Sequence, residues 1–156
     1  MESFKRKKKP IHFIFGGIKV RQIKFRFWDK KYNQYFKPIH EAYKGGLEDI
    51  TIGLQGDLIL RTMSDPAIHQ SVFPERFGPL QQYTGLKDKN GVEIFEGDIA
   101  EVRNSFGTLL YTGEIDFVFG SFGIKNKGSL YETPKFSYLL VIGNIYQHPH
   151  FLEESR

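Results

Sequence analysis

The sequence predicts a mainly β protein, and three observations lead to this fold class. Apolar and polar residues alternate with a period of two in several short stretches, as they do along a half-buried strand. Gly, Pro, Asn and Asp, the residues that tight turns require, separate these stretches. Aromatic residues, which favour pleated surfaces, make up 15% of the chain, and 16 glycines accompany them. We therefore expect short strands joined by tight turns.

The first predicted strand covers residues 23–28. Its two faces are Ile23, Phe25 and Phe27 on one side and Lys24, Arg26 and Trp28 on the other. We expect the apolar face to point toward the core and the second face outward, with packing of Trp28 under the proline-rich loop as the alternative for that residue. Residues 29–34 predict a turn that leads into a returning arm at residues 35–37.

A second hairpin is predicted from residues 50–54 and 58–61, where Ile50, Ile52 and Leu54 alternate with polar residues. Residues 64–80 contain three prolines and a glycine, and this composition predicts an irregular loop.

Residues 82–102 carry the clearest local signals of the chain. Asp88-Lys89-Asn90-Gly91 predicts a reverse turn, because Asn tolerates left-handed dihedral angles and Gly adopts them without a steric cost. We expect a positive φ at Gly91 and a hairpin whose arms are residues 83–86 and 92–95. Glu96-Gly97-Asp98 then turns the chain into a strand at 99–102, and Asp98 is expected to cap backbone N–H groups at this corner.

The longest predicted strand is residues 109–119. One face carries five large apolar residues around a central glycine: Leu109, Tyr111, Gly113, Ile115, Phe117 and Phe119. Phe117 is therefore expected in the core and Asp116 outside. Gly113 is expected to mark a bend or bulge in a strongly curved strand.

The C-terminal part predicts two further strands and a short helix. Gly120-Ser121 turns the chain into a strand at 122–125. Residues 138–142 are apolar on both faces, as expected of a strand that is central or covered on both faces. Pro149 can begin a last helical turn.

Charge and composition limit the classes of function. The formal net charge is +4, but residues 1–19 hold six basic residues and one acid, a net of +5, which leaves −1 for residues 20–156. A nucleic-acid interaction would therefore depend largely on the basic arm, Lys5 to Lys9. The absence of cysteine excludes disulfides and thiolate metal sites and is consistent with a reducing cytoplasm, where we expect the protein. No apolar run is long enough to span a bilayer.

Four segments, in order, resemble the motifs of the YopX family, small proteins encoded by bacteriophages and prophages. They are residues 23–30 (IKFRFWDK), 83–99 (YTGLKDKNG followed by IFEGDI), 113–117 (GEIDF) and 141–149 (VIGNIYQHP). The resemblance implies an SH3-like β-barrel over residues 82–156 with its C-terminal helical turn, preceded by a β-hairpin lobe at 21–81. It implies no enzymatic activity. The motif residues to which we assign a structural role are Gly85, Asp88, Asn90, Gly91, Gly97, Asp98, Gly143, Asn144 and Pro149.

Members of this family begin near the position of Val20, so residues 1–20 are interpreted as an extension. Two explanations stay open. The segment is either a disordered basic arm or the product of translation from upstream of a GTG start codon at Val20, with Gly16-Gly17 encoded by a ribosome-binding sequence.

Candidate catalytic and metal-binding groups have simpler structural explanations. Glu114 and Asp116 form a carboxylate pair of the kind that acid–base catalysis uses, yet the solvated face of a strand gives the same spacing. His148 and His150 flank a proline, which places them poorly for zinc. We therefore predict no catalytic residues, no metal and no cofactor.

Two functions remain. The first is a non-catalytic phage accessory protein that contacts a host protein, a phage protein or a second copy of itself. The second, which we rank lower, is nucleic-acid binding through the basic arm and the strand at 23–28, where aromatic and basic residues alternate. The candidate contact surface is Lys24, Arg26, Trp28, Tyr83, Asp98 and Tyr146. No membrane interaction is expected.

Overall fold

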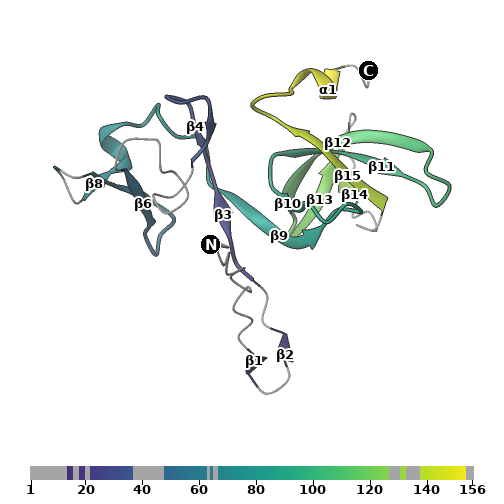
Figure 1. The fold of residues 1–156 in the computed structure, drawn as a ribbon, viewed down its shortest axis with the longest axis horizontal. Coiled ribbons are helices and arrows are strands. Elements are labelled where there is room, and N and C mark those ends of the chain that lie inside the picture. Colours follow the sequence, from purple (N-terminus) through teal and green to yellow (C-terminus); the bar gives the residue numbers. More distant parts are fainter. Residues whose placement is uncertain are drawn as a thin grey trace, which may run out of the picture.

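The computed structural model describes residues 14–15, 18–19, 22–36, 48–62, 64, 67–126, 131–132 and 138–153. The predicted extension lies mostly outside the described residues. Its described part is one antiparallel pair, β1 (Ile14–Phe15) and β2 (Ile18–Lys19). Strands dominate the described chain, which confirms the mainly β class (Figure 1). Among the described residues, no helix is long and apolar enough to cross a membrane.

The described residues between 25 and 80 include several short strands. β3 (Phe25–Arg26) is followed by β4 (Trp28–Asp29) and β5 (Gln34–Tyr35), which pair across the predicted turn. β6 (Asp49–Ile52), β7 (Leu58–Arg61) and β8 (Ile68–His69) form a three-stranded antiparallel sheet. The loop predicted at 64–80 thus contains β8 and a 3-10 turn, η1 (Gln70–Val72), which corrects that prediction. Phe27, Leu58 and Phe77 are the buried centre of this region.

β9 (Gln81–Lys87) and β10 (Glu93–Phe95) form the predicted hairpin around Asn90-Gly91. Gly91 has a φ of 83°, as predicted. β3 pairs with the other edge of β9, so the sheet order is β10-β9-β3. Figure 1 shows β3 and β9 running between the short strands of residues 28–80 and the larger sheet. β3, from the N-terminal part of the chain, therefore pairs with a strand at the start of the C-terminal half.

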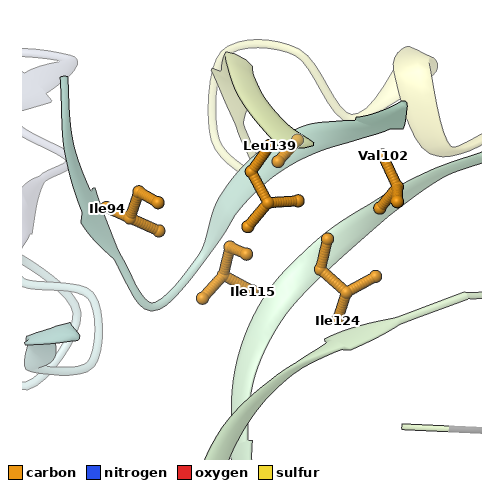
Figure 2. Close-up of a cluster of buried hydrophobic side chains, with 6 residues drawn as sticks. Ile94, Val102, Ile115, Ile124 and Leu139 are labelled. Carbon is orange, nitrogen blue, oxygen red and sulfur yellow. The ribbon is translucent and has the colours of Figure 1, made fainter. Parts of the chain in front are cut away.

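The larger sheet has the order β14-β13-β12-β11-β15. Its strands are β11 (Asp98–Arg103), β12 (Leu109–Val118), β13 (Ser121–Lys125), β14 (Tyr131–Glu132) and β15 (Leu139–Asn144), and the short helix α1 (His150–Glu153) follows. Ile94 of β10 joins side chains of this sheet in one buried cluster, drawn in Figure 2: Ile94, Ala100, Val102, Ile115, Ile124 and Leu139. The two sheets thus share a core.

The predicted faces of the strand at 23–28 are correct for Phe27, which is buried, and wrong for three other residues. Ile23 and Phe25 are exposed, whereas Trp28, expected outside, is only 3% exposed. The strand is interrupted at Phe27, and both Phe27 and Trp28 are buried because each side of this segment is covered by a different part of the chain.

Three predictions for the larger sheet also need correction. Phe117 lies on the same side of β12 as buried Ile115 but is 48% exposed, because the core ends before it. The register shift of β12 lies opposite Val102 and Arg103, not at Gly113. A Cβ at Gly113 would lie 2.5 Å from the Lys125 carbonyl oxygen, so this glycine permits close approach of β13. β15, predicted to be central or covered on both faces, is an edge strand in the described sheet, and its residues between Leu139 and Asn144 are partly buried.

Candidate functional site

Most of the predicted contact residues come together around the side chain of Arg26. Its Nη2 donates to Asp98 Oδ1 at 2.6 Å and to the Glu96 carbonyl oxygen at 3.2 Å, and its Nε donates to Gln81 Oε1 at 3.0 Å. The other oxygen of Asp98 accepts the Phe95 N–H at 2.8 Å, so Asp98 caps the corner as predicted. This carboxylate therefore joins β3 to the start of β11.

Aromatic rings enclose the same guanidinium. It lies 4.2 Å from the ring centroid of Tyr35 and 4.6 Å from that of Phe95, within the range of cation–π attraction. Next to it, the rings of Trp28 and Tyr146 stack with centroids 5.1 Å apart and planes 9° from parallel. The C-terminal turn is thereby packed on the N-terminal strands.

Burial is the largest cause of the pKa shifts of Asp98, Tyr35 and Tyr146 in this cluster. It raises the pKa of Asp98 above its ordinary value, although the charge of Arg26 opposes the shift. Burial also raises the pKa of Tyr35 and of Tyr146, so both phenols stay protonated at neutral pH. Their hydroxyl oxygens are buried and have no hydrogen-bond partner within the described part of the chain. The contacts described above are ring packing and neutralisation of the Asp98 charge by Arg26.

Asp88 has a comparable role at the tip of the β9–β10 hairpin. Its Oδ1 accepts the N–H groups of Asn90 and Val92, both at 2.8 Å, and its Oδ2 accepts the N–H of Val141 at 3.1 Å. The Lys89 N–H also donates to the Leu139 carbonyl oxygen at 3.2 Å. The turn therefore contacts the outer edge of β15.

The remaining motif residues shape backbone turns. Asn144 Oδ1 accepts the N–H groups of Tyr146 and Gln147, each at 3.0 Å. Gly97 has a φ of 72°, and a Cβ there would lie 1.9 Å from Gln81 Nε2. Gly85 also has a positive φ, a Cβ at Gly143 would meet the His148 ring at 2.7 Å, and Pro149 directly precedes α1.

Four of the six predicted contact residues lie near one another, namely Arg26, Trp28, Asp98 and Tyr146, whereas Lys24 and Tyr83 form a separate contact. Trp28, Tyr83 and Asp98 are buried. Lys24 forms an ion pair with Glu93 and lies over the Tyr83 ring. Because a base can stack only on an accessible ring, Trp28 in this position cannot support the nucleic-acid hypothesis.

Glu114 and Asp116 point to the outer side of β12. Burial, and secondly the charge of Asp116, raise the pKa of Glu114. Among the described residues, no group of three or more His, Asp or Glu side chains could hold a metal ion. His148 Nδ1 instead receives the Asn144 N–H at 3.4 Å, and its ring stacks on Phe151.

Sequence reasoning missed the exposed apolar residues at the two ends of β12. At its start, Leu109 and Leu110 are exposed beside Phe106, along an open groove of about 760 Å³ that Ile142 and Phe151 also line. At its end, Phe117 and Phe119 are exposed. The length of the alternating apolar row at 109–119 could have indicated this exposure. A row of this length is longer than a small core is wide, so its end residues must lie outside the core.

Residues 24–153 match the family model described as YopX protein. The chain belongs to the YopX family. Among solved structures, protein EF1440 from Enterococcus faecalis is 28% identical, with a TM-score of 0.53 over 85% of this chain and 99% of that chain. Protein yopX from Bacillus subtilis is 18% identical, with the same TM-score and coverage, and supports the fold alone. No curated protein matches the chain.

Proposed function

We propose that this YopX family protein is a non-catalytic phage or prophage accessory protein that acts in the bacterial cytoplasm by binding another protein. The observation that carries the proposal is the exposure of large apolar side chains at both ends of β12: Phe106, Leu109, Leu110, Phe117 and Phe119. Patches of exposed apolar residues are typical of protein interaction sites, and each end of β12 carries more than one such side chain.

The structural roles of the motif carboxylates favour binding over catalysis. Asp88 and Asp98 each accept backbone N–H groups, and Asp98 also pairs with Arg26. These groups are thus engaged in holding turns and strands.

We also propose that residues 82–156 form an SH3-like barrel with a gap. β10 and all the strands from β11 to β15 except β14 contribute to one buried cluster. Between the β9–β10 turn and β15, the contacts of Asp88 and Lys89 take the place of a strand ladder. Barrels of this kind present their loops and strand ends to partners, by analogy of fold.

Site-specific photo-crosslinking tests the function. A photoreactive phenylalanine analogue replaces Leu110 or Phe119 in the full chain, expressed in bacteria carrying the phage. Leu54, which is fully exposed at the β6–β7 turn, provides a matched control position. We expect one protein to crosslink from β12 and not from position 54, and the purified pair to bind. Equal labelling from all three positions, or labelling of nucleic acid only, would contradict the proposal.

A further inference from the structure

The turn of the β9–β10 hairpin contains a reactive dipeptide, Asn90-Gly91. We propose that Asn90 is a site of spontaneous deamidation, and that the hydrogen bonds of Asp88 slow this reaction by holding the turn closed. Asn90 and Gly91 are both exposed, so water reaches the side-chain amide and the peptide bond that follows it. This modification goes beyond the proposed protein contact and does not depend on it, because its reactants are the turn and water.

The reaction needs only water as a co-reactant. The backbone nitrogen of Gly91 attacks the side-chain Cγ of Asn90 and forms a C–N bond. The amide nitrogen of Asn90 leaves as ammonia, and solvent carries the proton of the Gly91 N–H to it. Water then opens the cyclic succinimide at either carbonyl, which gives an aspartyl residue or an isoaspartyl residue whose backbone passes through the side-chain carbons. No oxidation or reduction takes place.

Glycine is the residue that hinders this attack least, because it has no Cβ beside the attacking nitrogen. A Cβ built on Gly91 would have no neighbour within 4 Å, so the space around this residue is open. Asn33 is also exposed in a turn, but the side chain of Gln34 follows it and crowds the corresponding nitrogen. Asn90 is therefore the more reactive of these two exposed asparagines.

The folded turn opposes the attack. The Gly91 N–H donates to the Asp88 carbonyl oxygen at 3.0 Å, so the attacking nitrogen is engaged. Asp88 Oδ1 accepts the N–H groups of Asn90 and Val92, both at 2.8 Å, on either side of the reacting bond. Ring closure requires rotation of the Asn90 backbone, which these hydrogen bonds resist. Local opening of the turn therefore limits the rate.

Asp88 also joins the turn to β15. Its Oδ2 accepts the Val141 N–H at 3.1 Å, and the Lys89 N–H donates to the Leu139 carbonyl oxygen at 3.2 Å. Either product disturbs this connection. The isoaspartyl residue lengthens the backbone of the turn, and both products place a new carboxylate near that of Asp88, which repels it. Deamidation should thus loosen the contact between the turn and β15.

Peptide mapping of the full chain during incubation at mildly alkaline pH tests the site. Mass spectrometry follows the conversion, and methylation by an isoaspartyl methyltransferase identifies the isoaspartyl product. We expect Asn90 to convert slowly in the folded protein and faster in urea, and Asn33 to convert more slowly than Asn90 in urea. Conversion in urea no faster at Asn90 than at Asn33 would refute the site. Equal rates at Asn90 with and without urea would refute the protection by the fold.

Variants test the role of Asp88. Asp88→Ala should accelerate the conversion at Asn90 at least about tenfold, because it removes hydrogen bonds to a charged group that hold the turn. Asp88→Asn, whose amide oxygen can still accept the N–H groups of the turn, should convert more slowly than Asp88→Ala. Equal rates in these two variants would overturn the role of the carboxylate side chain.

Ile115→Ala is the matched control, because it weakens the core without changing a contact of the turn. It should leave the rate at Asn90 unchanged. Acceleration as large as in Asp88→Ala would show that global unfolding controls the reaction. Amide hydrogen exchange of the deamidated wild type is the second readout. We expect faster exchange at Val141, and unchanged exchange there would contradict the loosened contact with β15.

Discussion

Replacing Asp88 by Ala should destabilise the protein by removing the carboxylate that joins the β9–β10 turn to β15. The side chain is buried and accepts three backbone N–H groups, those of Asn90, Val92 and Val141. Hydrogen bonds to a charged group contribute about 1.5–3 kcal/mol each, and water can recover part of the loss at the exposed residues Asn90 and Val92. We expect the free energy of unfolding to fall by roughly 3–5 kcal/mol.

Asp88→Asn separates the two connections. The amide oxygen can still accept the Asn90 and Val92 N–H groups, but the amide NH₂ would face the N–H of Val141 and cannot accept it. The turn should therefore persist while its contact with the edge of β15 is lost.

The assay is urea unfolding combined with amide hydrogen exchange. In Asp88→Asn we expect faster exchange at Val141 and retained protection at Val92. Asp116→Ala is the matched control, because Asp116 Oδ1 accepts only the N–H of the next residue, Phe117, and its loss should change stability by at most about 0.5 kcal/mol. Unchanged exchange at Val141, or equal stability of the two alanine variants, would refute the proposed bridge.

Two further predictions concern β12. Ile115→Ala should lower the free energy of unfolding by about 2–5 kcal/mol and Phe117→Ala by only about 1 kcal/mol, since Ile115 is 1% exposed and Phe117 is half exposed; equal denaturation midpoints would show that the core boundary is misplaced. Because the pKa of Glu114 is raised in the folded state, the wild type should lose stability as the pH rises from the ordinary glutamate value of 4.5 through the folded-state pKa. Glu114→Gln should not show this loss, so its advantage over the wild type in urea titrations should be larger at neutral than at acid pH, and a constant difference would contradict the assignment.

Local chemistry made the segment 82–102 predictable. The Asn90-Gly91 turn and the glycine corner at Gly97 depend on dihedral angles that few other residues adopt, and both φ values are positive. The capping role of Asp98 follows from its position next to that corner. Its second role, the ion pair with Arg26, joins residues 72 positions apart, and no local pattern indicates it.

The strand at 23–28 shows what alternation cannot reveal. The pattern predicts that two faces differ, and it assigns the more apolar face to the core. Here the face with Arg26 and Trp28 is covered instead, because Asp98 neutralises the arginine and Tyr146 covers the indole ring. The partners that reverse the expected orientation come from distant parts of the sequence.

The exposed surface was also beyond the sequence pattern. Periodicity identified the side of β12 that carries Ile115 and Phe117, but it does not say where the core ends. Phe119 was predicted on the same face because it continues the alternation. In the structure it belongs to the two-residue turn between β12 and β13 and is exposed, so its assignment to the strand was wrong.

The central claim is that Trp28 and the family-motif residues packed around it are part of the protein interior and do not form a binding surface. The fluorescence of Trp28 tests this claim most directly. Trp28 is the single tryptophan of the chain, so its emission reports one position. Because the indole is buried against Tyr146, we expect blue-shifted emission, weak quenching by acrylamide until urea unfolds the protein, and no response to single-stranded oligonucleotides. Red-shifted emission in the folded protein, with quenching by oligonucleotides at physiological salt, would contradict this and place a nucleic-acid site on the strand at 23–28.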